Sequence, residues 1–552
     1  MERVCCREQG IIQLDGFNLS IFSGEIIGLL PVNSHGLTAL LRLLQRNSPL
    51  HYGYVYYKEK QVNTWRDFKK RKNRIGLIQS ESCLVEGLTV ADNIFVLRPG
   101  FRKWLLRPRI LREQLAPFLE GIGISISADA YIDELTDFER VVVDVLKSVV
   151  AGCKLIVLRD ISADLCEAEL EKIHLLLQHY AQDGLSFLYI DYHFEELRKI
   201  CCKVALMSNG RIIKILQGDS LVPESLYAYT GAYIGKVRQQ ISRHESGKSK
   251  ESFLFQVTYS SGVTGSPSFP GTSDITDASG ITDASGITDT SGISDASGIT
   301  GTSGTSDTSR SPGASGITDA SGRMMNGFSF SVAPGECVVL QNVDVQIFGG
   351  FLSILSGKTS PESGELLLDG KPANLEMGGN IAVIQELPTK TMIFNELSYF
   401  DNLCFMLDRR LPEIWRDNRV RAGVRREYME ILGHDVFDLR VDALSEAQKY
   451  HLVYARTVMQ KPKVVFCVQP FRQADMELRM RIMEHMQMLL DKGMALVILT
   501  VNLADSLSLA DKLIRIRRDK PEEVYVRSEF STMPVNAPWI ELYRESRSSR
   551  PC

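Results

Sequence analysis

The chain has 552 residues, and its 63 Lys and Arg residues nearly balance 67 Asp and Glu residues, which gives a formal net charge of −4. A near-neutral chain has no overall basic field for holding nucleic acid or anionic lipid. Hydrophobic residues make up 44% and charged residues 24%, which excludes disorder of the whole chain. The length suggests two domains of about 250 residues with room for a linker.

Targeting signals and cysteine frameworks are absent from the sequence pattern. The N-terminal residues have no apolar core behind a basic start, and no segment reaches the roughly 18 uninterrupted apolar residues needed to cross a bilayer, so we expect neither secretion nor membrane insertion. The 11 cysteines include the neighbouring pairs Cys5-Cys6 and Cys201-Cys202 but no CxxC framework. We interpret them as reduced, buried or unreactive thiols in a cytoplasm.

The first half of the chain has the pattern of alternating strands and helices. Residues 14–44 predict a strand, a turn at Ser23-Gly24-Glu25, a second strand, a polar loop and a leucine-rich helix. A polar-led helix follows at 135–152, and short apolar runs at 154–160 and 185–191 predict buried strands. Continuous apolar strands that alternate with helices indicate a parallel α/β sheet.

Residues 260–322 break this composition abruptly. They consist of a six-residue unit, ITDASG and close variants, from 275 to 298 and again at 317–322. One isoleucine per six residues buries too little apolar surface to offset the entropy of ordering, so we predict a disordered tether. A calcium-binding β-roll is the alternative, but its repeats carry glycine pairs and a nine-residue period.

The second half repeats the plan of the first. Residues 327–357 again predict strand, turn, strand, loop and helix, with the turn at Pro334-Gly335-Glu336. A polar-led helix at 444–460 precedes apolar runs at 463–469 and 494–500. The chain is therefore an internal duplication, and the repeat lies between two predicted strands of the second half, at 251–259 and 323–332.

In these segments the chain resembles the ATP-binding subunit of ABC importers, in particular the fused double-cassette type that drives uptake of ribose, galactose and other monosaccharides. The likeness rests on the two Gly-Glu turns and on the order and spacing of residues 76–96, 202–214, 363–372 and 461–475. It implies an α/β fold of two tandem P-loop NTPase-like cassettes, each a mixed, mainly parallel sheet flanked by helices, with a helical subdomain. The expected divisions are a first cassette at 1–245, a linker and strand at 246–259, the insert at 260–322, a second cassette at 323–535 and a tail at 536–552.

The first phosphate loop departs from the pattern that the resemblance implies. A P-loop, G-x-x-x-x-G-K-[ST], needs glycines for close backbone approach, a lysine for the β- and γ-phosphates and a hydroxyl for Mg²⁺. The aligned stretch keeps Asn33, Gly36 and Thr38 as vestigial nucleotide-binding residues, with Thr38 a weak metal candidate. Pro31 replaces the first glycine and Leu37 replaces the lysine, which removes an N–H group and a positive charge.

The remaining motifs are lost as well. Phe348 stands at the lysine position of the second loop, and the strand ends that should read Asp-Glu are Arg159-Asp160 and Val468-Gln469. Tyr192 occupies the position of a histidine that contacts the γ-phosphate, and the adjacent His193 is expected to point to the other face of a strand. In the two signature loops, Phe138 and Ala447 replace glycines, and Glu446 adds a negative charge beside the retained Ser445.

Four residues have two interpretations each. Gln79, at the family's Q-loop position, either couples to a membrane partner or is an ordinary residue at a strand end. Gly36 and Thr38 either start and pack a helix or bind a metal, and a single hydroxyl without lysine or aspartate does not make a Mg²⁺ site. Asp160 is either a weak candidate for a catalytic base or a capping carboxylate beside Arg159.

The preferred hypothesis is a degenerate double-cassette subunit, a pseudo-ATPase that binds or regulates an integral-membrane permease from the cytoplasm at the inner face of the plasma membrane. ATP and Mg²⁺ are cofactors by resemblance alone, and an intact ATPase paralogue is a possible partner. One alternative is a functional ATPase that energises monosaccharide import, and another is a soluble scaffold without a permease. The basic clusters at 66–74 and 102–109 are interpreted as solvated faces or as surfaces toward a permease or lipid, and nucleic acid is not expected as a partner.

Overall fold

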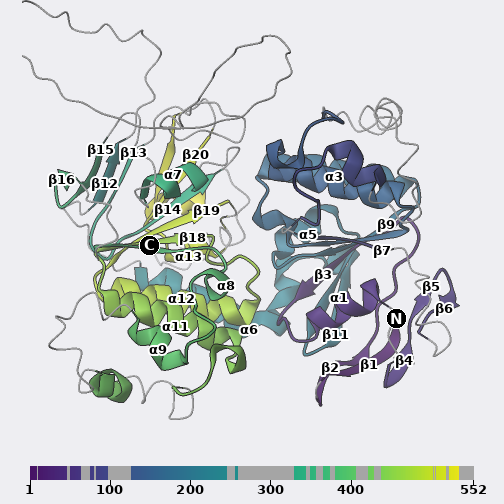
Figure 1. Ribbon diagram of the computed structural model, residues 1–552, viewed down its shortest axis with the longest axis horizontal. Helices are drawn as coiled ribbons and strands as arrows, with labels where there is room; N and C mark the ends of the chain where they lie inside the picture. The colour runs from purple at the N-terminus through teal and green to yellow at the C-terminus, as the bar shows by residue number, and fades with distance from the viewer. Residues whose placement is uncertain are drawn as a thin grey trace, which may run out of the picture.

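The computed structural model shows two α/β halves side by side (Figure 1). It describes residues 1–8, 10–46, 50–63, 75–79, 82–96, 126–244, 255–258, 329–342, 348–355, 365–372, 380–405, 421–427, 437–501, 503, 505–517 and 521–533. The predicted insert at 260–322, the tail at 536–552 and the basic clusters at 66–74 and 102–109 lie outside these residues.

The first half is built on a six-stranded sheet with the order β11-β10-β3-β9-β8-β7. Its strands are β3 (Ile26–Pro31), β7 (Ile75–Gln79), β8 (Leu155–Arg159), β9 (Ser186–Ile190), β10 (Lys203–Ser208) and β11 (Arg211–Gln217). All neighbouring pairs are parallel except β10 and β11. The runs predicted at 154–160 and 185–191 are the central strands β8 and β9, in which the middle residues are completely buried.

Helices cover this sheet, and a small antiparallel sheet adjoins it. The helices are α1 (Leu37–Gln45), α3 (Asp137–Val150), α4 (Glu167–Gln182), α5 (Phe194–Ile200) and α6 (Tyr227–His244). The small sheet has the order β2-β1-β4, from β1 (Glu2–Glu8), β2 (Ile11–Phe17) and β4 (Tyr52–Tyr54), and a two-stranded ribbon joins β5 (Tyr56–Tyr57) to β6 (Lys60–Gln61). Leu37 and Leu40 of α1 pack with Ile27 and Leu29 of β3 in one apolar cluster.

The second half has the same sheet order, β21-β20-β14-β19-β18-β17. Its strands are β14 (Cys337–Asn342), β17 (Ile381–Ile384), β18 (Val464–Val468), β19 (Ala495–Thr500), β20 (Lys512–Ile516) and β21 (Glu523–Val526). The helices are α7 (Phe348–Leu355), α8 (Pro388–Thr391), α9 (Tyr399–Cys404), α11 (Glu446–Gln460), α12 (Met476–Asp491) and α13 (Ser506–Leu509). The prediction of two tandem, mainly parallel sheets is confirmed.

A second antiparallel sheet, β13-β12-β15-β16, belongs to this half. Its strands are β12 (Phe255–Thr258), β13 (Ser329–Val332), β15 (Glu365–Leu368) and β16 (Lys371–Pro372). Thr258 at the end of β12 pairs with Ser329 at the start of β13. The two described residues that flank the segment with the six-residue repeats are therefore paired with each other.

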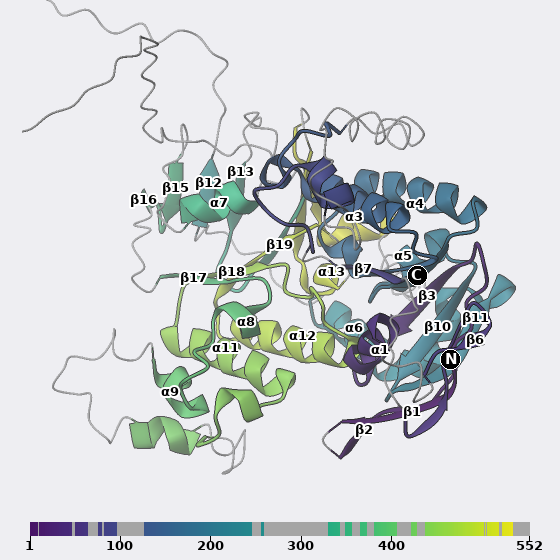
Figure 2. The same ribbon diagram turned by 45° about the vertical axis from the view of Figure 1, so that its right-hand side comes forward.

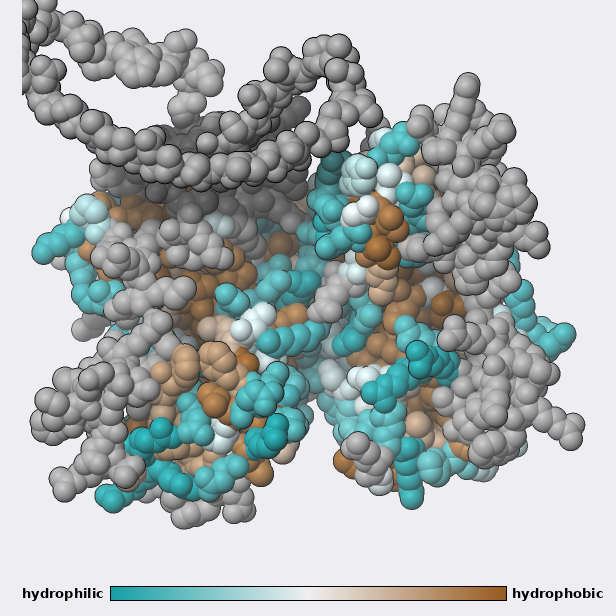
Figure 3. All heavy atoms as spheres, in the orientation of Figure 1, coloured by the Kyte–Doolittle hydropathy of each residue, from teal (hydrophilic) through white to brown (hydrophobic). Residues whose placement is uncertain are grey.

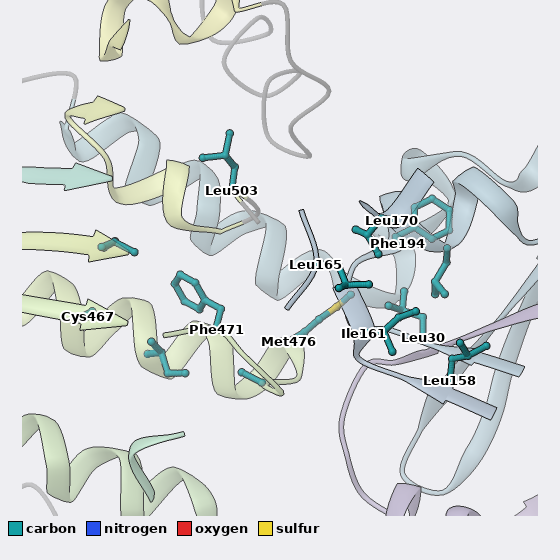
Figure 4. Packing of buried hydrophobic residues seen from close by; sticks show 14 of the residues in the cluster. Leu30, Leu158, Ile161, Leu165, Leu170, Phe194, Cys467, Phe471, Met476 and Leu503 are labelled. Atoms are coloured by element: carbon teal, nitrogen blue, oxygen red, sulfur yellow. The ribbon is translucent and has the colours of Figure 1, made fainter. Parts of the chain in front are cut away.

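The two halves lie head to tail. In both ribbon views α1 of the first half lies toward the bottom, level with α11 and α12 of the second half (Figures 1 and 2). The helices α3 of the first half and α7 of the second both lie toward the top. One apolar cluster contains residues of both halves, including Leu165 of the first and Met476 of the second. Met476 points toward Leu165 and Ile161 (Figure 4).

The space-filling view shows two lobes that meet along a seam and are separated by an indentation below it (Figure 3). No helix among the described residues is long and apolar enough to cross a membrane.

Candidate functional site

The first phosphate loop connects β3 to α1, and its central residues pack against neighbouring backbone. Gly36 caps α1 in the left-handed region with φ 83°. A Cβ atom at Gly36 would lie 2.2 Å from the carbonyl oxygen of Gln13, so only glycine fits there. The side chain of Leu37 is 1% exposed in the core, whereas Thr38 is exposed. Gly36 and Leu37 thus start and pack a helix.

Backbone N–H groups of this loop already have protein acceptors. The N–H of Val32 donates to the carbonyl of Met207 at 2.8 Å, and the N–H of Leu37 donates to the carbonyl of Ser34 at 3.1 Å. The N–H of Ser34 donates to Oδ2 of Asp475 in the second half at 2.7 Å. A carboxylate oxygen therefore accepts a backbone N–H that a P-loop would donate to a phosphate oxygen.

Asn33, in the same loop, is tied to the turn between β10 and β11. Its amide nitrogen donates to Oδ1 of Asn209 at 2.9 Å, and its Oδ1 accepts the N–H of Asn209 at 2.9 Å. A further contact at 3.3 Å joins this nitrogen to the hydroxyl of Ser208. The side chain of Asn33 thus holds the loop in place rather than facing a ligand.

A guanidinium group stands where the resemblance implies a metal-binding aspartate. Nη1 of Arg159, the last residue of β8, donates to Oε1 of Gln79 at 3.4 Å. Among the described residues no carboxylate lies within ion-pair distance of Arg159. Tyr192 is 2% exposed, and burial raises the pKa of its hydroxyl while the nearby Arg159 opposes the shift. The fixed positive charge of Arg159 would repel Mg²⁺ from this position.

Asp160, the residue after Arg159, is buried. It adopts a left-handed conformation with φ 55°, and its N–H donates to the carbonyl of Ile190 at 2.9 Å. Burial raises the pKa of Asp160 to about 8, and the neighbouring carboxylates of Asp191 and Asp164 add to the shift. The carboxyl group is therefore mostly protonated at neutral pH, which does not suit the role of a general base.

The signature residues are used to cap helices. The side chain of Thr136 accepts the N–H of Glu139 at 3.2 Å and begins α3. Ser445 likewise accepts the N–H of Gln448 at 3.3 Å and begins α11. Phe138 is 9% exposed and belongs to the core.

The charged residue of the second signature loop also has a local partner. The carboxylate of Glu446 pairs with Lys449 one turn later at 2.9 Å. The adjoining Ala447 is exposed at the start of α11. Both signature loops are therefore ordinary helix starts with capping boxes.

The corresponding positions of the second half lack ionisable groups. Val468 is buried at the end of β18, and Gln469 has φ 43° with its N–H bonded to the carbonyl of Leu499 at 2.8 Å. Phe348 begins α7, while residues 343–347 of the second phosphate loop lie outside the described residues.

The structure brings His193 and Tyr192 together at the seam with Arg479, Arg472 and Asp164, which the sequence did not single out. The expectation that His193 points away is wrong, because β9 ends at Ile190 and His193 instead lies 3.2 Å from Nη2 of Arg479 in the second half. The ring of Tyr192 lies under the same guanidinium group at 5.9 Å. Arg472 pairs with Asp164 across the seam at 2.7 Å. Arg479, Arg472 and Asp164 had no motif to reveal them.

The cysteines fit a structural interpretation. Among the described residues none forms a disulfide, and Cys201 is buried, which raises the pKa of its thiol. Cys5 and Cys6 are partly buried, whereas Cys202 is exposed.

Comparison with known proteins gives matches to both halves. The family model described as "ABC transporter" matches residues 14–160 and 350–471. The ribose import ATP-binding protein RbsA of Oceanobacillus iheyensis is 20% identical over 529 residues, which are 94% of this chain and 93% of that protein. RbsA 3 of Rubrobacter xylanophilus is 23% identical over 260 residues, 45% of this chain, and the match spans about half (52%) of its length. Among solved structures, an RNase-L inhibitor matches with a TM-score of 0.51 and 12% identity over 95% of this chain and 90% of that one, which bears on the fold alone.

Proposed function

This chain is a double-cassette protein of the ABC transporter family, and on that premise we propose that it serves a sugar-type importer as a pseudo-ATPase that binds or regulates the permease. The relatives that match it over nearly their full length are ribose import ATP-binding proteins, which supports a sugar transporter as the setting. The protein would then work in the cytoplasm, at the inner face of the plasma membrane.

The observation that carries the proposal is that side chains of the protein itself take positions in the first nucleotide site that Mg-ATP would need. The carboxylate of Asp475 takes the N–H of Ser34, and the guanidinium of Arg159 takes the place of a metal ligand. Leu37 supplies an apolar side chain to the core instead of an ammonium group to a phosphate. The residues present thus do not fit Mg-ATP, because an anion would meet a carboxylate and the metal would meet a cation.

Exposed apolar residues in both halves support a permease as the partner. Val85 lies after Gln79 in the first half and Phe394 lies before α9 in the second, and both side chains are 45% exposed. The backbone of each is clamped in the same way. Oδ1 of Asn93 accepts the N–H of Val85 at 2.8 Å, and Oδ1 of Asn402 accepts the N–H of Phe394 at 2.9 Å. Two rigid loops with exposed apolar tips support two docking points related by the internal duplication.

The permease part of the proposal is tested by membrane association. We expect the double variant Val85→Glu/Phe394→Glu to sediment with inner-membrane vesicles about tenfold less than the wild type. Docking would bury the two new carboxylates against the permease, and their loss of water would oppose binding. The matched control is Leu175→Glu, which alters an exposed apolar residue on α4. Trypsin treatment of the vesicles should abolish binding. Binding that survives trypsin, or that Leu175→Glu weakens equally, would refute a protein receptor at these loops.

The enzymatic part is tested by steady-state ATP turnover of the purified full-length chain. We expect no hydrolysis above the rate in buffer without protein, whereas a relative such as the Oceanobacillus iheyensis protein serves as the positive control. Turnover in the wild type that Asp160→Asn abolishes would instead establish the alternative, an ATPase with an unusual site.

A further inference from the structure

A buried arginine of the second half lies at the centre of the seam. The Arg479 side chain on α12 is 3% exposed, and its Nη1 lies 3.0 Å from Oδ2 of Asp505, whose side chain is 1% exposed. Nε of Arg479 donates to the carbonyl of Ala474 at 2.8 Å. The second half alone therefore orients the guanidinium group toward the first half.

Two separate elements of the first half reach this ion pair. From the loop after β9, Nε2 of His193 lies 3.2 Å from Nη2 of Arg479, and the ring of Tyr192 lies under the guanidinium. From α6, the hydroxyl of Tyr233 donates to Oδ1 of Asp505. His193 is itself held by Asp191, whose Oδ1 accepts the N–H of His193 at 2.8 Å. The cluster thus joins α12 and the start of α13 in the second half to α6 and the loop after β9 in the first, through hydrogen bonds to charged groups, which are the stronger kind.

Contacts on either side of this cluster continue the seam. Arg472 pairs with Asp164 at 2.7 Å, and both side chains are largely buried. Lys236 of α6 pairs with Glu484 of α12 at 2.9 Å. Near the C-terminal end of α6, Nη2 of Arg527 donates to the carbonyl of Ile241 at 3.1 Å. The stretch of α6 from Tyr233 to Ile241 is therefore attached to the second half, although α6 belongs to the first half by sequence.

We infer that Arg479, Asp505, Tyr233 and His193 form a lock that holds the two cassettes against each other without nucleotide. The two buried charges of the lock, on Arg479 and Asp505, are paired with each other within the second half. Removal of one partner would leave a buried charge uncompensated, so the seam should open only at high cost. The inference rests on the proposed function, since an importer ATPase that cycles would have to separate these surfaces in each turnover.

Hydrogen–deuterium exchange of the full-length chain, with and without Mg-ATP, tests the lock. In the wild type we expect α6 and the Ser34–Leu37 loop to be protected to the same extent in both conditions. In Arg479→Met we expect exchange in these segments to rise at least tenfold, because the buried carboxylate of Asp505 loses its partner. The matched control is Arg481→Met on the same helix, whose side chain is 58% exposed and pairs with Glu484.

A milder pair of variants covers the case in which Arg479→Met fails to fold. Tyr233→Phe removes the hydroxyl that bonds Asp505, and Tyr229→Phe removes a hydroxyl from a half-exposed position of the same helix. Faster exchange of α6 in Tyr233→Phe but not in Tyr229→Phe supports the lock. Equal behaviour of the two variants, or wild-type protection that appears only with Mg-ATP, overturns it.

Nucleotide binding in the same samples separates this inference from the proposed function. Nucleotide-independent protection in a chain that nevertheless binds and hydrolyses ATP would refute the pseudo-ATPase and keep the lock. No ATP binding together with unchanged exchange in both Arg479→Met and Tyr233→Phe would refute the lock and keep the pseudo-ATPase.

Discussion

The residues after β8 and β18 have the same backbone and different chemistry. Asp160 and Gln469 both adopt a left-handed conformation, with φ 55° and 43°, and both donate their N–H to the next parallel strand, at 2.9 and 2.8 Å. One carries a buried, mostly protonated carboxyl and the other an amide. The duplication has therefore kept the scaffold of each cassette while its ionisable groups changed, because backbone hydrogen bonds tolerate either side chain.

If the scaffold is shared, the two asparagine clamps should contribute equally to stability. Asn93 and Asn402 are each completely buried, and each bonds the loop before its helix through three or more hydrogen bonds. We expect Asn93→Ala and Asn402→Ala each to lower the free energy of unfolding of its own half by about 3 kcal/mol, because buried donors and acceptors lose their partners. Urea unfolding checks this, and a clamp that can be removed from one half without cost would break the comparison.

The chemical difference between the halves should appear as a pH dependence. Because the pKa of Asp160 is raised to about 8 from an ordinary value near 4, the folded protein binds more protons than the unfolded chain between these values. The free energy of unfolding therefore falls as pH rises through that window. Asp160→Asn mimics the protonated form, so its gain in stability should be larger at pH 8 than at pH 5, by about 4 kcal/mol. Gln469→Asn is the control, and we expect it to show the same effect at both pH values.

The segment between β12 and β13 distinguishes the second half from the first. Because Thr258 and Ser329 are paired, replacement of residues 260–322 by a short glycine-rich loop should leave the sheet intact. The shorter loop costs less entropy to close, so we expect the free energy of unfolding to rise by about 1–2 kcal/mol. Thermal unfolding measures the change, and loss of the folded second half on deletion would show that the repeats are structural.

The helix caps at the two signature positions should have similar, smaller effects. Thr136→Ala and Ser445→Ala each remove an acceptor for a backbone N–H at the start of a helix. We expect a loss of about 1 kcal/mol in each case. The conservative variants Thr136→Ser and Ser445→Thr keep a hydroxyl acceptor, so their free energy of unfolding should match that of the wild type. A change in either variant that affects ATP handling without affecting stability would indicate that the residue keeps a role in nucleotide binding.

Local pattern was sufficient to predict the strands of both halves. The predicted runs at 154–160 and 463–469 correspond to β8 (Leu155–Arg159) and β18 (Val464–Val468), since continuous apolar residues bounded by polar ones admit few other structures. The strands predicted on either side of the repeats, at 251–259 and 323–332, contain β12 (Phe255–Thr258) and β13 (Ser329–Val332), and residues 323–328 lie outside the described part of the chain.

The seam could not be predicted from the sequence. On α12, Arg479 and Arg481 look alike in the sequence, yet one side chain is 3% exposed and the other 58%. What distinguishes them is contact with Asp505 and with residues of the first half that are distant in sequence. For the same reason the contact of Asp475 with the phosphate loop has no local signal, because an aspartate before a helix already has a sufficient explanation as a cap.

The most direct test of the pseudo-ATPase is a calorimetric titration of the full-length chain with Mg-ATP. We predict no binding at millimolar nucleotide. A variant that combines Arg159→Asp with Asp475→Ala, which removes the misplaced cation and the competing carboxylate, should gain measurable affinity, whereas Arg481→Met should not. Micromolar binding by the wild type, weakened by substitution of Thr38 or Asp160, would contradict the account and establish this chain as a nucleotide-binding subunit.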